Sequence, residues 1–268
     1  GMLPDERFHF MRVLADALRK VKPAETVLIT DRHRDADGVR VVLSPAPEDQ
    51  RAYSHRIWTD ILPVVYTSHS LIIQFDAGIC DAGAWDDGWL AWDRVEAPWP
   101  GKPGHTGGGG FALRSRKLLT ALQDFPPKHP EDSWVTFHLA NELAARGVTS
   151  APVEVGAQFG WQFKKPAHPV FGYHGLFSWH DALSDAEICA RVDLLSESHV
   201  TRGPFLDIFR DGAQSGRVNL CEAVYRRYRR MRSRDQFWRQ LGPYGPDAHR
   251  VFETLKDGDM HVSDLRPP

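Results

Sequence analysis

The stretch Leu71-Ile72-Ile73-Gln74-Phe75-Asp76-Ala77-Gly78 decides the fold class of this chain. Residues 71–75 form a short and almost continuous apolar run, which predicts a strand buried on both faces. Asp76 and Gly78 end that run at once. Continuous apolar strands are typical of mostly parallel sheets, in which ligands bind beyond the carboxyl ends of the strands. Asp76 is expected to stand at such an end.

The chain before this strand repeats the pattern of helix and strand. Residues 4–21 carry apolar side chains at helical spacing and acids in the first turn, which predicts a helix. Short apolar runs at 26–30 and 39–43 predict two more strands. A helix is expected over 53–66, interrupted near Pro63. This alternation indicates an α/β fold, with a mostly parallel mixed sheet flanked by helices.

The chain after this strand is expected to begin with loops, rich in Trp, Asp and Pro over 85–99 and in glycine over 100–110. Two helices should follow, the first with Ser115 as its N-cap. Two extended segments come next. The helices are predicted over 115–123 and 131–146, and the extended segments over 148–163 and 168–177.

The character of the chain changes near residue 180, where we predict a domain boundary. Residues 2–180 would form the α/β domain and residues 181–268 a helical C-terminal extension packed on its core. Apolar periodicity predicts helices over 181–198 and 219–238, with a segment containing glycine and proline between them. A short helix is expected over 248–255. No internal repeat is present.

Composition excludes several classes of protein. The chain has 268 residues, 33 basic and 35 acidic, giving a net charge of −2, which argues against a nucleic-acid binder. No run approaches the roughly 20 apolar residues of a membrane span, and residues 1–7 lack the apolar part of a signal peptide. Three widely spaced cysteines form no disulfide framework or zinc motif, and fit a reducing cytoplasm.

Four clusters could carry chemistry. Asp76 could bind a divalent cation, or merely cap a turn. The glycines 107–110 could let backbone N–H groups reach a ligand beside Arg114, or form a flexible loop. Glu131 and Asp132 could supply a general base, or be ordinary acids of a helix start. His174, between aromatic and glycine residues, could bind a metal or phosphate, or be structural.

A fifth cluster is the arginine-rich segment 226–232. Apolar side chains at helical spacing place its arginines on one face. A solvated helix face is the plain interpretation, and docking on an anionic membrane surface is the alternative.

These clusters occur in an order that resembles a known family. From residue 53 to residue 175 the chain resembles the domain of unknown function 5672 family, a group regarded as candidate glycosyltransferases. The segments that carry the resemblance are Gln74-Phe75-Asp76, Ala84-Trp85-Asp86-Asp87, Ala97-Pro98-Trp99-Pro100, Gly109-Gly110-Phe111-Ala112-Leu113-Arg114-Ser115-Arg116-Lys117-Leu118-Leu119, His129-Pro130-Glu131-Asp132 and Phe171-Gly172-Tyr173-His174-Gly175.

The resemblance implies a GT-A-like, Rossmann-like fold and transfer of a sugar from a nucleotide-sugar donor to an unknown acceptor: a glycan, a lipid-linked acceptor or a small molecule. It implies that Asp76 and His174 hold Mn²⁺ or Mg²⁺ on the donor diphosphate. It assigns the donor site to further residues and the general base to Asp132 or Glu131. Those further donor-binding residues are Gln74, Gly109, Gly110 and Arg114.

The sequence departs from the family pattern in two ways. Gln74-x-Asp76 has one carboxylate fewer than the Asp-x-Asp motif common in GT-A enzymes, and an Asn of the family's glycine loop is replaced by Gly108. In addition, the strand that should precede the first helix is expected to be absent from this sequence, so that either the start is misassigned and the strand lies upstream of Met2, or the nucleotide pocket is altered. A non-catalytic binding module for a nucleotide-sugar or carbohydrate, and a nucleotidyltransferase on a similar fold, therefore stay open as alternatives.

Overall fold

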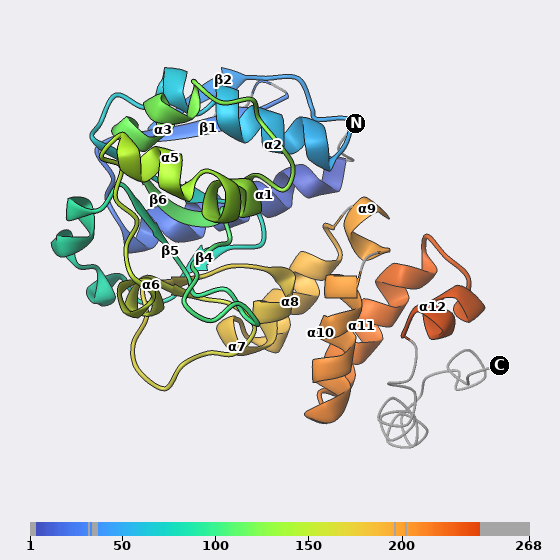
Figure 1. Cartoon of the computed structure of the whole chain (residues 1–268). Coiled ribbons are helices and arrows are strands. Elements are labelled where there is room, and N and C mark those ends of the chain that lie inside the picture. The colour runs from blue at the N-terminus through green and yellow to red at the C-terminus, as the bar shows by residue number, and fades with distance from the viewer. Residues whose placement is uncertain (1–3, 32, 34–36, 196, 202, 242–268) are drawn as a thin grey trace. The chain divides into compact units, whose positions relative to one another are not determined.

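The computed structural model describes residues 4–31, 33, 37–195, 197–201 and 203–241 (Figure 1). The chain divides into two compact units. One unit is Val13–His174, and the other combines Met2–Arg12 with Gly175–Pro268. The division after His174 lies close to the boundary that the sequence predicts near residue 180.

The chain begins with helix α1 (Pro4–Lys20) and the strands β1 (Thr26–Thr30) and β2 (Val39–Leu43). These bounds are close to the predicted ones. The two strands pair in parallel, with Thr26 opposite Val39 and Thr30 opposite Leu43. They form a sheet of their own.

The strand that opens the sequence argument is β3 (His69–Ile73), and it ends before Gln74. It belongs to a three-stranded sheet in the order β3-β6-β5, with β6 (Phe111–Ser115) in the centre and β5 (Arg94–Glu96) at one edge. Both pairings are antiparallel. Every residue of β6 is buried. A continuous apolar run reports burial on both faces but not the direction of the neighbouring strand, so the expectation of parallel pairing is wrong here.

A third sheet has the order β4-β8-β7, from β4 (Gly78–Ile79), β8 (Gly172–Tyr173) and β7 (Gly160–Trp161). β4 and β8 are antiparallel, and β7 and β8 are parallel. The described residues therefore form a mixed α/β fold with three small sheets and mostly antiparallel pairing. One mostly parallel sheet, as the sequence predicts, is not what they build.

Helices surround these sheets. Ser115 caps α3 by accepting from the Leu118 N–H, as predicted. The predicted helix 53–66 is α2 followed by a 3₁₀ turn, and residues 153–159, predicted to be extended, are helical. The helical elements of this unit after α1 are α2 (Gln50–Thr59), the 3₁₀ turns Leu62–Val64, Ala82–Ala84 and Asp87–Ala91, α3 (Arg116–Leu122), α4 (Glu131–Ser133), α5 (Ala140–Ala145) and α6 (Val153–Phe159).

The helix predicted over 131–146 is divided by a π-helical turn at Trp134–His138. There the Leu139 N–H donates to the carbonyl of Trp134, five residues earlier, at 3.1 Å. Val135 and Leu139 are buried in the core, whereas Trp134 lies at its margin under the ammonium of Lys128. A π turn holds one residue more than an α turn, which changes the face that later residues present.

An aromatic core fixes the segments that lead into the site. Trp89, Phe111, Phe159 and Phe171 are almost completely buried, and their ring centroids lie 5.1–5.9 Å apart. Phe111 directly follows the four glycines, and Phe171 directly precedes β8. The core therefore anchors both the glycine segment and the strand that leads to His174.

The unit that contains Gly175–Pro268 is helical where it is described, which confirms a mainly helical C-terminal region. α8 begins with a capping box between Ser184 and Glu187. One correction concerns residues 203–214, which form an amphipathic helix in place of the predicted irregular segment. The predicted helix 248–255 lies outside the described residues. The helical elements after residue 174 are a 3₁₀ turn (Leu176–Ser178), α7 (Trp179–Ala182), α8 (Asp185–Val192), α9 (Glu197–Val200), α10 (Gly203–Gln214), α11 (Val218–Arg229) and α12 (Arg234–Leu241).

None of the helices in the described part of the chain is long and apolar enough to cross a membrane.

Candidate functional site

The segment Gly107–Gly110, here the glycine loop, is buried and connects β5 with β6. The Gly107 N–H donates to the Ala97 carbonyl at 2.9 Å, and the Gly110 carbonyl accepts from the Gln74 N–H at 2.8 Å. These bonds tie the loop to the ends of two strands of one sheet. The loop is therefore a fixed part of the fold and not a flexible surface segment.

The glycine loop brings side chains from distant segments against its backbone. A Cβ at Gly109 would overlap Glu131 and Arg114, and a Cβ at Gly110 would overlap His174 and Gln74. Four of the sequence-predicted site residues are thus neighbours of two glycines. The absence of side chains in the loop allows this close approach.

Asp76 and His174 lie together. Asp76 follows β3 in a turn, and His174 follows β8 and donates its backbone N–H to the Trp161 carbonyl at 3.1 Å. His174 Nε2 is 3.8 Å from Asp76 Oδ1, and both side chains are partly exposed. A nitrogen and an oxygen at this separation can both contact one divalent cation, whose ligands lie at roughly 2.0–2.6 Å.

Two protein ligands are fewer than a structural metal site uses. The described residues contain no group of three or more His, Cys, Asp and Glu side chains that could hold a metal ion. The pair Asp76 and His174 fits a cation whose other ligands are substrate phosphates and water, which is how Mg²⁺ is usually bound.

A buried chain of charges lies behind the glycine loop. Glu96 is fully buried and forms ion pairs with Arg94 and with Arg114, the latter at 3.0 Å. Arg114 also pairs with Glu131 at 3.1 Å, and Arg94 donates to Thr136 in the π turn at 2.6 Å. Burial alone would raise the pKa of Glu96, but the two guanidinium groups lower that pKa to about 2. Glu96 is therefore ionised.

This chain of charges changes the role expected of Arg114. Its guanidinium is 2% exposed and is shared by Glu96 and Glu131. The sequence predicts contact with the donor, whereas the structure gives Arg114 internal acidic partners that fix the position of Glu131.

Glu131 and Asp132 have different surroundings. Glu131 is buried, and burial raises its pKa. The charge of Arg114 lowers this pKa and the charge of Asp132 raises it, and the net shift is upward. Asp132 is half-buried, and its Oδ1 accepts from the Ser133 N–H at 2.7 Å. Asp132 is thus the more accessible of the two carboxylates at this helix start.

Tyr53 is a member of the site that sequence reasoning missed. Gln74 donates its side-chain N–H to the Tyr53 hydroxyl. The pKa of Tyr53 is raised, first by burial and then by the charges of Glu131 and Asp76. Tyr53 therefore lies within electrostatic reach of both acidic parts of the site. The family resemblance begins at Tyr53, which is the one signal that could have marked it.

Glu96 and Gln162 were missed as well. No apolar pattern marks Glu96 as buried, because β5 is Arg94-Val95-Glu96, with a charged residue at each end. Gln162 donates its side-chain N–H to the Gly107 carbonyl at 2.8 Å. No sequence signal marks Gln162.

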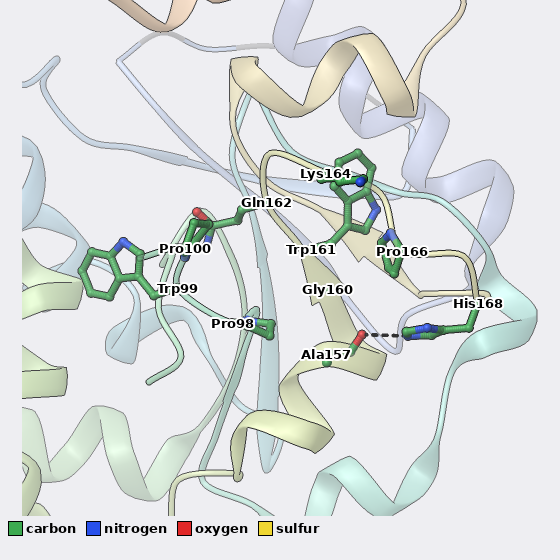
Figure 2. A pocket seen from close by; sticks show the side chains of 10 residues that line it. All are labelled: Pro98, Trp99, Pro100, Ala157, Gly160, Trp161, Gln162, Lys164, Pro166 and His168. Carbon is green, nitrogen blue, oxygen red and sulfur yellow. Dashed lines mark hydrogen bonds between the residues drawn. The ribbon is translucent and has the colours of Figure 1, made fainter. Parts of the chain in front are cut away.

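A pocket of about 230 Å³ adjoins the glycine loop (Figure 2). Pro98 lies on one side of it, and Trp161 and Pro166 lie on the other. Gln162, which holds Gly107, lines the same pocket. His168 Nε2 donates to the Ala157 carbonyl at 3.4 Å, so in the neutral ring Nδ1 carries the lone pair. The pocket thus combines apolar walls with a few polar groups.

Comparison with known proteins gives one match. No curated protein and no solved structure matches the chain. Residues 48–174 match a family model described as protein of unknown function DUF5672. This range contains every site residue named above, and it agrees with the resemblance that the motifs indicate. Residues 48–174 of the chain are accordingly similar to the family described as protein of unknown function DUF5672.

Proposed function

We propose that residues 48–174 bind a nucleotide-sugar with a divalent cation and transfer its sugar to an acceptor hydroxyl, on a core that is a reduced relative of the GT-A fold. The observation that carries this proposal is the approach of His174 to Asp76, at 3.8 Å, against the backbone of the glycine loop. The donor diphosphate would complete the coordination of the cation. Bound there, Mn²⁺ or Mg²⁺ would supply Lewis-acid stabilisation of the departing diphosphate.

The residues of the chain have distinct roles in this proposal. Asp132 accepts the proton of the acceptor hydroxyl as general base, because it is the accessible carboxylate of the pair. Glu131 is held by Arg114 and acts as a positioning residue. Gln74 and Tyr53, joined by a hydrogen bond, orient the donor beside Asp76.

The first experiment is donor binding. Thermal unfolding of the full chain is measured with nucleotide-sugars, with and without Mn²⁺. A ligand at about 100 times its Kd stabilises the folded state by about 2.7 kcal/mol, which raises Tm by several degrees. Asp76→Asn and His174→Asn should remove the Mn²⁺-dependent part of this shift. His55→Asn and Asp124→Asn change exposed side chains elsewhere and should keep it.

Product analysis separates the alternatives. A glycosyltransferase consumes nucleotide-sugar and releases nucleoside diphosphate, whereas a nucleotidyltransferase consumes nucleoside triphosphate and releases pyrophosphate. A binding module shows the thermal shift but no release. Absence of any shift with all nucleotide-sugars would reject the proposed function.

A further inference from the structure

The pocket lined by Pro98, Trp161, Gln162, Lys164, Pro166 and His168 is connected to the candidate site through the backbone. Trp161 stands opposite Tyr173 in the parallel pair β7–β8. His174 follows Tyr173 directly in the sequence. The Trp161 carbonyl also accepts the His174 N–H. Gln162, the next residue, holds the carbonyl of Gly107. Trp161 and Gln162 thus hold His174 and Gly107 of the candidate site by hydrogen bonds, and both residues also line the pocket.

The lining chemistry indicates which ligand this pocket takes. Trp161 is 4% exposed and is fixed by its packing against Tyr173, with ring centroids 6.0 Å apart, so only the margin of its indole reaches the pocket. The indole of Trp99 points away from the pocket and stacks on Phe137. Pro98 and Pro166 add apolar surface (Figure 2). An amphipathic ligand with apolar C–H faces matches these walls.

The polar groups that line the pocket restrict the chemical class of ligand that it can bind. Gln162 offers an amide, Lys164 an ammonium and His168 an imidazole nitrogen with a lone pair. The pocket lining contains no carboxylate, which disfavours a cationic ligand. Donors and acceptors spread around apolar walls suit a ring that carries several hydroxyl groups, each of which both donates and accepts.

The size of the pocket agrees with a single ring. Its volume of about 230 Å³ is below the roughly 300–1,000 Å³ of pockets for drug-sized ligands. A nucleobase is the other flat ligand that stacks on indole. It is best held between two planar surfaces, whereas this lining offers the puckered rings of prolines and only the margin of one indole.

We infer that this pocket is the acceptor subsite and that it binds one sugar ring, with its C–H groups against Pro98, Pro166 and the margin of Trp161, and its hydroxyl groups on Gln162 and His168. The acceptor role rests on the proposed function, since it requires a donor at Asp76 and His174. Binding of the sugar ring itself can be measured without any donor.

The test is saturation-transfer NMR on the full chain with methyl glycosides of glucose, galactose and mannose, and with uridine monophosphate as a separate probe. At least one glycoside should receive saturation. Ala157→Phe places a ring in the pocket from α6 and should weaken that glycoside at least tenfold. Ala145→Phe, on an exposed position of α5, should bind like the wild type. His168→Ala, an exposed position that does not challenge folding, should weaken binding several-fold.

Each outcome of these binding experiments either supports or overturns the sugar subsite. The absence of saturation transfer to every glycoside, or unchanged glycoside binding in both Ala157→Phe and His168→Ala, overturns the inference. Uridine monophosphate binding that is lost in Ala157→Phe while glycosides stay bound overturns it in favour of a nucleobase. Donor binding is followed separately, as the Mn²⁺-dependent thermal shift, and should persist in Ala157→Phe. If glycosides bind in the pocket but no nucleotide-sugar shifts Tm, the proposed function fails and only the sugar subsite stands.

Discussion

Glu131 and Asp132 are adjacent in sequence, but they lie in different environments and we expect them to have different roles. Glu131 is buried against Arg114, so its carboxylate is part of the interior charge chain. Asp132 keeps contact with solvent. Helical periodicity cannot separate two consecutive residues at a helix start, and only the position of Arg114 reveals the difference.

The first prediction concerns these two acids. Asp132→Asn should keep the fold, with a loss of at most about 1 kcal/mol, and keep donor binding, but lower turnover at least 10²-fold. Glu131→Gln should cost about 1–3 kcal/mol, because it weakens a buried charge-assisted hydrogen bond. Stability is measured by urea unfolding and turnover by release of nucleoside diphosphate. Full turnover in Asp132→Asn would show that the base is elsewhere.

The second prediction concerns Glu96 and pH. Its pKa falls from 4.5 to about 2 on folding, so its contribution is complete above about pH 4.5 and is lost as the pH falls toward 2. A change of 2.5 units at about 1.4 kcal/mol per unit corresponds to about 3 kcal/mol. Glu131 acts in the opposite direction, because its pKa is raised and its protonated form favours the folded state at low pH.

The measurement for Glu96 is the urea-unfolding free energy of wild type and Glu96→Gln at several pH values between 6 and 2.5. The difference between the two proteins should shrink by up to about 3 kcal/mol across this range. Glu25 is an exposed acid paired with Arg40, and Glu25→Gln is the matched control whose difference should stay small. A pH-independent gap between wild type and Glu96→Gln would contradict the depressed pKa.

Sequence patterns identify residues of this site where chemistry is local. Asp76 follows an apolar run and His174 stands between glycine and aromatic neighbours, and the structure brings the two within 3.8 Å. Patterns fail where a role depends on a distant partner. Arg114 looks like a ligand-binding cation in the sequence, but Glu96 comes from another strand and neutralises it.

At the scale of elements, the glycine loop acts as a spacer between strands β5 and β6. Its glycines admit Glu131 on one side and His174 on another, and the loop carbonyls hold Gln162 and Gln74 in place. Sequence alone left open whether four glycines form a flexible loop or an anchored one. The buried Phe111 that follows them favours anchoring, and the structure confirms it.

The third prediction concerns this loop. Gly109→Ala and Gly110→Ala force a methyl group into Glu131 or His174, and should each cost about 1–3 kcal/mol. Gly110→Ala should also abolish the Mn²⁺-dependent thermal shift, because His174 must move. Gly203→Ala, at the start of α10 where no atom lies within 4 Å of an added Cβ, should be neutral or slightly stabilising. Wild-type behaviour of Gly110→Ala would contradict the packing described here.

Strand location was more predictable than strand pairing. β1 and β2 have the predicted bounds, and β3 is displaced by only two residues, because short runs of Val, Ile and Leu mark strands in any sheet, although most residues of these three strands are only partly buried. The direction of β3 against β6 depends on two segments that are far apart in the chain, and no local sequence signal reports it. The helix α6 was mistaken for extended chain because Val153, Val155 and Phe159 have high strand propensity, and tertiary packing overrides it.

At the scale of the whole molecule, the net charge and the pairing of surface arginines bear on whether the chain binds an anionic membrane surface. The chain has a net charge of −2. Three of the five arginines in the segment 226–232 face acids: Arg226 pairs with Glu222, Arg230 with Asp193 and Arg232 with Glu197. The other two, Arg227 and Arg229, donate to backbone carbonyls. An arginine that is already paired gains less from an anionic surface than the roughly 1 kcal/mol of a free one.

The fourth prediction follows from this pairing. Sedimentation of the full chain with phosphatidylserine-containing vesicles at about 0.15 M salt should equal sedimentation with zwitterionic vesicles. The charge-reversal control Glu222→Lys frees Arg226 and adds a cation, and should increase binding to the anionic vesicles only. Salt-sensitive binding of the wild-type chain to anionic vesicles would instead support the membrane-surface alternative.

The burial of the glycine loop has a consequence for mutational scanning. Any substitution at 109 or 110 introduces a Cβ that collides with a neighbouring side chain, so a scan would score these positions as intolerant whether selection is for abundance or for activity. Asp132 has space and solvent around it, so its substitutions should lower activity scores and leave abundance scores unchanged. The contrast between the two scores at each position, and not intolerance alone, would therefore map which residues of the segment 48–174 perform chemistry.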